Sequence, residues 1–186
     1  FRPAPVEGLP RFYGGAVGYM SYDMIRHIER IPDENPDELD VPESYFIITD
    51  TVLIFDHAKR KLKIVVNQDA TGSDPGARYD EAVRTIARVI ERLRQTTSAP
   101  PLDGLVEDDL PEIPFRSNFK KSDFEDAVRK CQEYIRAGDI FQVVLSQRFS
   151  ANVSTDPIGL YRVLRTVNPS PYMYCLKFGD MAVVGS

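Results

Sequence analysis

Residues 45–66 carry the sequence YFIITDTVLIFDHAKRKLKIVV, which decides the fold class of the chain. Residues 45–55 are rich in β-branched and aromatic side chains and predict a strand. Residues 57–60 form a turn, and residues 61–66 return with partly alternating hydrophobicity. Two strands joined by so short a turn run antiparallel. We therefore expect a β-hairpin in this stretch.

Further strands are predicted over 14–21 and 140–149, and a second hairpin is predicted over 172–184 around a Gly-Asp turn. The glycines of 14–21 indicate close approach of a neighbouring backbone. Since strands outnumber helices and both hairpins are antiparallel, the expected fold class is α+β, with antiparallel sheets and packed helices. A doubly wound parallel sheet is not expected.

Three helices are predicted. Apolar residues recur with helical spacing over 78–95. A second helix begins near Ser122, where Glu125 completes a capping-box pattern, and ends at Gly138, since glycine adopts the left-handed conformation that closes a helix. The third helix spans residues 156–167, with an aspartate at its cap and a proline at its first position.

Residues 96–114 divide the chain. They contain four prolines and a run of acidic side chains, which predicts a linker between an N-terminal subdomain portion, 1–95, and a second part, 115–186. The chain begins at Phe1 and ends in an apolar segment expected to be a strand, and natural domains rarely stop inside a strand. We therefore expect a fragment of a longer protein, with the second domain truncated.

Composition excludes several classes of protein. Lys+Arg number 23 and Asp+Glu 28, giving a formal net charge of −5, which argues against the clustered basic surface that nucleic acid requires. No apolar run approaches the roughly 18 residues of a membrane span. With two cysteines, two histidines and no CxxC pattern, neither a disulfide framework nor a zinc site is expected. A cytoplasmic location is predicted.

Three stretches are candidates for chemistry, and no nucleophile–base pair is apparent. Residues 14–19 (GGAVGY) match no phosphate-binding spacing, so strand packing is the simpler interpretation. In 141–148, alternation places polar side chains on one face, which would line either a polar cavity or a solvent face. In 168–174 (NPSPYMY), two prolines set a rigid loop. That loop is either a helix stop before a core strand or an apolar ligand contact.

Residues 137–148 (AGDIFQVVLSQR) are similar to a stretch of the chorismate-utilising enzymes. Other stretches narrow the resemblance to anthranilate synthase component I, and together they cover nearly the whole chain: 160–162, 168–174, 14–19, 22–23 and 50–57. The resemblance implies a large α/β sandwich of antiparallel sheets. It also implies addition of ammonia to chorismate with magnesium and elimination of pyruvate to give anthranilate, for tryptophan biosynthesis. A glutamine amidotransferase, component II, would supply the ammonia, and tryptophan would inhibit from a remote pocket.

Site residues follow from the same resemblance. Gln142 stands where water-using relatives carry a lysine base. A neutral amide there fits an enzyme that adds an amine, because ammonia brings its own lone pair, so the expected role is positioning. The residues matching the loop segment that contacts the inhibitor tryptophan are Pro171, Tyr172 and Met173. Those expected to shape the same pocket are Asn168, Pro169 and Ser170.

The match stops at residues 185–186, the start of the family's Gly-Ser-Ser-Pro-Glu stretch. The family's catalytic histidine, its magnesium-binding glutamates and its chorismate-binding Gly-Thr and Arg lie downstream of that stretch. We therefore expect no metal ligand within these residues and no activity from the chain alone. Two alternatives remain open: aminodeoxychorismate synthase component I, and a noncatalytic module that binds an aromatic amino acid.

Overall fold

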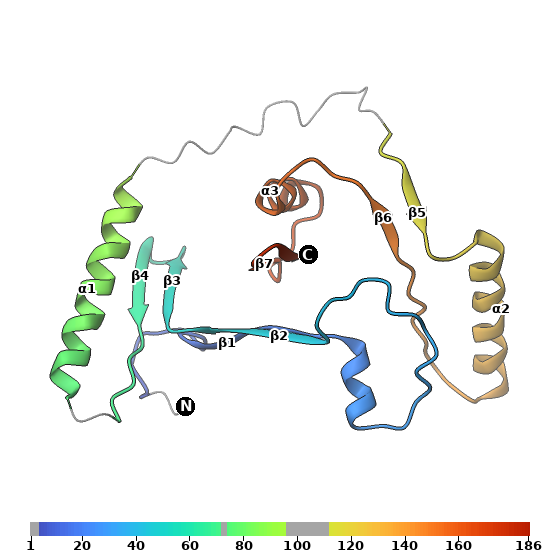
Figure 1. The fold of residues 1–186 in the computed structure, drawn as a ribbon, viewed down its shortest axis with the longest axis horizontal. Coiled ribbons are helices and arrows are strands. Elements are labelled where there is room, and N and C mark those ends of the chain that lie inside the picture. The colour runs from blue at the N-terminus through green and yellow to red at the C-terminus, as the bar shows by residue number, and fades with distance from the viewer. Residues whose placement is uncertain (1–3, 72–73, 96–111) are drawn as a thin grey trace. The chain divides into compact units, whose positions relative to one another are not determined.

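The computed structural model describes residues 4–71, 74–95 and 112–186 (Figure 1). By its contacts the chain divides into two compact units, Phe1–Ala99 and Pro100–Ser186. Most of the predicted linker, 96–114, lies outside the described residues. Helices and antiparallel strands occur in both units, which confirms the α+β class.

In the first unit, the elements in chain order are β1 (Gly15–Met20), the 3-10 helix η1 (Tyr22–His27), β2 (Ser44–Thr49), β3 (Thr51–Asp56), β4 (Lys61–Val66) and α1 (Pro75–Arg94). Strand β1 pairs antiparallel with β2, and β3 pairs antiparallel with β4. Helix α1 lies against β4, as Figure 1 shows. The hairpin predicted from 45–66 is confirmed for its β3–β4 part.

The prediction of a single strand over 45–55 was wrong, because the chain changes its strand-pairing partner at Asp50. The carbonyl oxygen of Asp50 accepts hydrogen bonds from the backbone N–H of Asn67 at 2.7 Å and from its side-chain Nδ2 at 3.2 Å. The same Nδ2 donates to the carbonyl oxygen of Tyr13 at 2.7 Å. This junction lets β2 pair with β1 while β3 pairs with β4.

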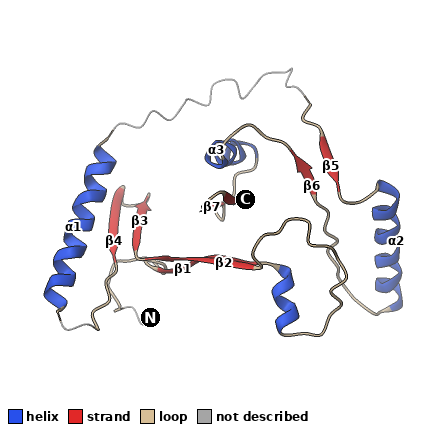
Figure 2. Ribbon diagram, in the orientation of Figure 1, coloured by secondary structure: helices blue, strands red, loops and turns tan. Residues whose placement is uncertain are grey.

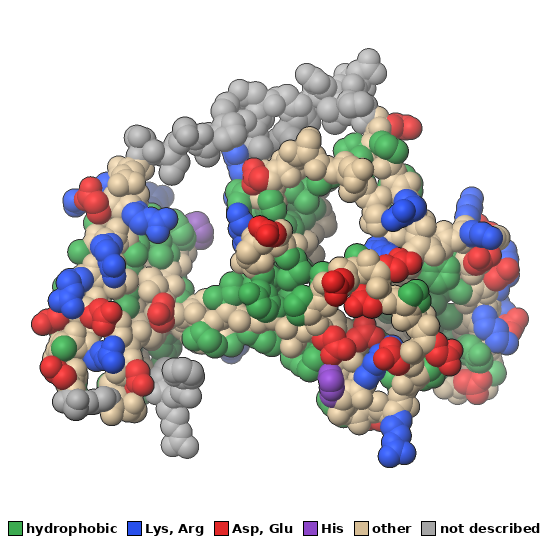
Figure 3. Space-filling view, viewed as in Figure 1, with side chains coloured by type: hydrophobic (Ala, Val, Ile, Leu, Met, Phe, Trp, Pro, Cys, Tyr) green, Lys and Arg blue, Asp and Glu red, His purple; other side chains and the backbone are tan. Residues whose placement is uncertain are grey.

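The β1–β2 ribbon carries apolar side chains on both faces. Ile48 and Met20 are each 62% exposed, and the neighbouring Phe46 and Ile47 are exposed as well. Hydrophobic side chains are visible across much of the view in Figure 3. A two-stranded ribbon is marginally stable in water, so β1–β2 depends strongly on the quality of its backbone pairing.

In the second unit, the elements are β5 (Phe115–Ser117), α2 (Lys121–Ala137), β6 (Phe149–Ala151), α3 (Pro157–Val167), β7 (Tyr174–Phe178) and β8 (Met181–Gly185). Strands β5 and β6 pair antiparallel, as do β7 and β8. Helix α3 contacts both strands of the β7–β8 hairpin. Figure 2 shows α3 close to β7. Among the described residues Phe178, on this hairpin, is the one large hydrophobic side chain that is buried, at 6% exposure.

The helix ends test the capping predictions. Gly138 closes α2 with φ 84°, as expected. At the start of α3 the Asp156 carboxylate accepts the backbone N–H groups of Ile158 at 2.8 Å and Gly159 at 3.1 Å, which confirms that cap. The capping box at Ser122 was wrong. Helix α2 already begins at Lys121, and the Ser122 hydroxyl donates to Asp123 Oδ1 at 3.0 Å.

The strand predicted over 140–149 was also wrong, since only its last residue enters a strand, β6. The partner, β5, is three residues long and reaches no further than Phe149. Residues with high strand propensity form a strand only where a neighbouring strand pairs with them.

The described helices include none that is both long and apolar enough to cross a bilayer.

The end of the β3–β4 hairpin predicts a pH dependence. Asp56 accepts the backbone N–H of Lys59 at 3.0 Å and forms an ion pair with Lys63 Nζ at 3.2 Å. The pKa of Asp56 is held below its usual 3.8. The hydrogen bond from the Lys59 N–H is the main cause, and Lys63 adds to it. A lowered carboxyl pKa contributes stability above the unfolded pKa, and this contribution is lost as the pH falls through the folded value.

We expect Asp56→Asn to unfold at a lower temperature than the parent protein at neutral pH. We also expect it to lose less stability than the parent between about pH 5 and pH 2, because one titrating carboxylate is gone. Thermal melts followed by circular dichroism across this range measure both effects. Asp80→Asn, at an exposed position of α1, is the matched control. Parallel pH profiles of the parent and Asp56→Asn would contradict the expectation.

Candidate ligand-binding loop

Residues 168–173 connect α3 to β7 and carry the predicted inhibitor contacts. Helix α3 ends at Val167 and is capped by Asn168, whose backbone N–H donates to the Leu164 carbonyl at 2.9 Å. The Asn168 φ of −138° takes the chain out of the helix. Pro169 and Pro171 each fix one backbone dihedral angle and donate no backbone hydrogen bond. The loop therefore leaves the helix with a restricted backbone and makes a turn at residues 171–172 before β7 begins.

Within the loop, the backbone N–H of Tyr172 donates to the Ser170 hydroxyl oxygen at 3.2 Å. The Tyr172 side chain is 86% exposed, and Met173 beside it is half-buried. An exposed aromatic ring next to a flexible thioether is an adaptable apolar contact surface. The loop contains no charged residue, so it suits an apolar or aromatic group of a ligand.

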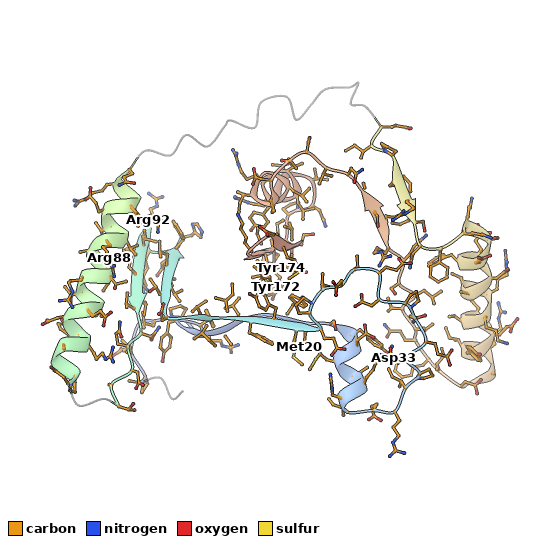
Figure 4. All side chains as sticks on the ribbon, in the orientation of Figure 1. Met20, Asp33, Arg88, Arg92, Tyr172 and Tyr174 are labelled. Carbon is orange, nitrogen blue, oxygen red and sulfur yellow. The ribbon has the colours of Figure 1, made fainter. Side chains whose placement is uncertain are left out.

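Both ends of the loop lie at the end of β8. The Asn168 carboxamide Nδ2 donates to the Ser186 hydroxyl oxygen at 2.7 Å. At the other end Tyr174 is paired directly with Gly185, and its ring covers the position that a Cβ atom at Gly185 would occupy. Tyr172 and Tyr174 are labelled in Figure 4.

Sequence reasoning did not select Tyr174, Gly185 or Ser186 as site residues. A signal for the first two was present, because a two-residue turn at 179–180 fixes a register in which Tyr174 faces Gly185. The hydrogen bond of Ser186 had no such signal, since it depends on where α3 packs against the hairpin.

Gln142 lies in a separate segment, 140–148, which has no regular secondary structure. Its side chain is exposed, as are Phe141 at 94% and Val144 at 82%. The alternating polar face expected here is not formed, because the segment is not a strand.

The far end of this segment is held against β5. Gln147 Nε2 donates to the Ser117 hydroxyl at 2.7 Å, and the Arg148 backbone N–H donates to Asn118 Oδ1 at 2.9 Å.

The predicted site residues form two groups, the loop 168–173 and Gln142. Their functional roles stay predictions.

Metal ligands were expected outside this chain. In residues 4–71, 74–95 and 112–186, no group of three or more His, Cys, Asp or Glu side chains is placed to hold a metal ion.

Comparison with known proteins identifies the family. The family model described as chorismate binding enzyme matches residues 2–186. Anthranilate synthase component 1 of Acetivibrio thermocellus is 44% identical over 188 aligned residues, covering 100% of this chain and 38% of that protein. The Aquifex aeolicus protein of the same name is 41% identical, covering 100% of this chain and 37% of its own length.

A solved structure agrees with the sequence matches. The crystal structure of anthranilate synthase component I from Streptococcus pneumoniae superposes with a TM-score of 0.74 at 36% identity, over 99% of this chain and 40% of that one. The chain thus spans about two fifths of the length of these relatives. It belongs to the chorismate binding enzyme family and is homologous to anthranilate synthase component 1.

Proposed function

We propose that this chain belongs to an anthranilate synthase component I, which converts chorismate and ammonia to anthranilate, pyruvate and water for tryptophan biosynthesis. The observation that carries the proposal is the 44% identity to a protein of that name across all of the chain. The ammonia would come from a glutamine amidotransferase, component II. We further propose that residues 1–186 alone do not turn over chorismate, since they span 38% of that relative.

Gln142 is the proposed positioning residue for ammonia. The oxygen of its amide accepts a hydrogen bond from an N–H of ammonia, which leaves the nitrogen lone pair directed away from the amide. A glutamine does not titrate, so it neither supplies nor removes a proton in this role. The exposed position of Gln142 in the structure leaves its amide accessible to a small solute.

Loop 168–173 is the proposed contact for tryptophan as a feedback inhibitor. Its exposed Tyr172 offers a ring for stacking against the indole. Met173 supplies an adaptable thioether against the same ring system. The two prolines reduce the entropy that the loop loses on binding.

The test of the function is an assay of the intact protein with chorismate, magnesium and ammonium, in which anthranilate is followed by its fluorescence. We expect turnover and its inhibition by tryptophan. Turnover by residues 1–186 alone would overturn the proposal that this chain is inactive. Product that is not anthranilate, together with insensitivity to tryptophan, would indicate an aminodeoxychorismate synthase.

Tyr172→Ala and Met173→Ala are each expected to raise the inhibition constant for tryptophan about tenfold, equivalent to about 1.4 kcal/mol of binding free energy. The KM for chorismate should stay unchanged, because the inhibitor contact is proposed to be separate from the substrate site. Tyr79→Ala is the matched control, since Tyr79 is a 70% exposed tyrosine on α1. Equal tryptophan inhibition of all three variants and the parent would exclude the loop as the contact.

A further inference from the structure

We infer that Ser186 is a positioning residue that holds loop 168–173 in its binding conformation, an inference that rests on the proposed tryptophan contact. Ser186 directly follows β8 and is 13 or more positions away in sequence from every loop residue. Its side chain nevertheless contacts the first residue of the loop. This contact joins the end of α3 to the end of the β7–β8 hairpin.

The first anchor is the hydrogen bond from Asn168 Nδ2 to Ser186 Oγ at 2.7 Å. The backbone N–H of Asn168 is already used by the Leu164 carbonyl. The side chain therefore provides the connection between the start of the loop and β8. Because Asn168 is the C-cap residue of α3, this bond fixes the direction in which the chain leaves the helix.

The second anchor is the cross-strand pair of Tyr174 and Gly185. The Tyr174 ring lies over Gly185, and a Cβ atom at that position would collide with it. An aromatic ring that covers a glycine on the opposite strand protects its backbone and fixes the ring. The end of the loop is thereby held at the residue next to Ser186.

Both ends of a six-residue loop are thus tied to two consecutive residues, Gly185 and Ser186. Between these anchors the loop holds itself through the Tyr172 N–H to Ser170 hydroxyl bond and through two prolines. A loop fixed at both ends has fewer conformations to lose when a ligand binds. Release of one anchor should therefore weaken binding without removing any atom that touches the ligand.

The experiment measures tryptophan binding to the intact protein by titration calorimetry. We expect Ser186→Ala to raise the Kd about fivefold, the effect of one neutral hydrogen bond. Ser186→Thr keeps the hydroxyl and should restore affinity to within about twofold of the parent, inside the scatter of such measurements. Asn168→Ala should lose at least as much affinity as Ser186→Ala, because Asn168 also belongs to the proposed contact loop. The double variant should be no weaker than Asn168→Ala, because both substitutions remove the same bond.

Hydrogen exchange of the loop peptide, measured without ligand, gives a readout that does not depend on tryptophan. We expect faster exchange in Ser186→Ala and parent-like exchange in Ser186→Thr. If the parent protein binds no tryptophan, the proposed inhibitor contact fails and the exchange measurement alone decides the role of Ser186. If Met173→Ala loses affinity while Ser186→Ala keeps both its affinity and its exchange rate, the inference about Ser186 is overturned. Faster exchange with unchanged tryptophan affinity overturns it as well.

Discussion

Gly18→Ala is expected to lower the free energy of unfolding by about 2–3 kcal/mol, the upper part of the range for an overpacked site. Gly18 is paired with Phe46 in the β1–β2 ribbon. A Cβ atom at Gly18 would collide with the Tyr45 carbonyl oxygen and the Phe46 Cα atom. Both are backbone atoms, so no side-chain rotation relieves the collision and the two strands must separate.

Within this chain the apolar residues on both faces of the ribbon are exposed, so its pairing is supported by cross-strand hydrogen bonds, including that from the Thr49 hydroxyl to the Gly15 carbonyl at 2.9 Å. We therefore expect the loss of pairing to spread along β1 and β2. Urea denaturation of the intact protein, followed by far-ultraviolet circular dichroism, measures the change in stability.

Gly76→Ala is the matched control for the added methyl group. In the first turn of α1, a Cβ atom at Gly76 would meet only Asp74 Oδ1, at an ordinary contact distance of 3.4 Å. Alanine in a helix is favoured over glycine by about 0.5–1 kcal/mol, so this variant should be neutral or more stable. If Gly18→Ala were as stable as Gly76→Ala, strand spacing in β1–β2 would not depend on the glycine.

Local patterns predicted those parts of the fold whose interactions are close in sequence. The β3–β4 hairpin, the β7–β8 hairpin, the Asp156 cap and the Gly138 helix end each depend on contacts within a few residues. The errors occurred where a distant partner decides. Asp50 breaks a continuous run of strand formers because Asn67 binds its carbonyl, and residues 140–148 stay irregular because β5 is short.

The same distinction applies to the candidate site. The loop 168–173 was visible in the sequence because its two prolines and Tyr172 lie close together, within 169–172. The anchor at Ser186 was not visible, because it exists only when α3 lies against the β7–β8 hairpin and brings Asn168 to the end of β8. Sequence patterns alone left the loop open between a helix stop and a ligand contact, and the resemblance to anthranilate synthase component I implied its contact residues. Neither indicated Ser186, the residue proposed to position them.

Gln142→Lys is expected to lower ammonia-dependent anthranilate formation about 100-fold, equivalent to about 2.7 kcal/mol of activation free energy. A lysine ammonium group has three donors and no acceptor. The lysine ammonium group would therefore donate to the lone pair of ammonia, which is the electron pair that must attack chorismate. The amide oxygen of Gln142 is proposed instead to accept a hydrogen bond from an N–H of ammonia, which leaves the lone pair free. A misplaced nucleophile alone costs a factor of about 100.

Initial rates of the intact protein with ammonium as the nitrogen source measure this effect. Gln142→Glu is the informative comparison, because a carboxylate keeps the acceptor oxygen and should lose less activity than lysine does. Both variants should melt at the parent temperature, since the side chain at 142 is exposed and lies in a segment without helix or strand. Tryptophan inhibition should also persist, because loop 168–173 is unchanged. An equal loss of rate in the lysine and glutamate variants would show that hydrogen-bond acceptance is not what Gln142 contributes.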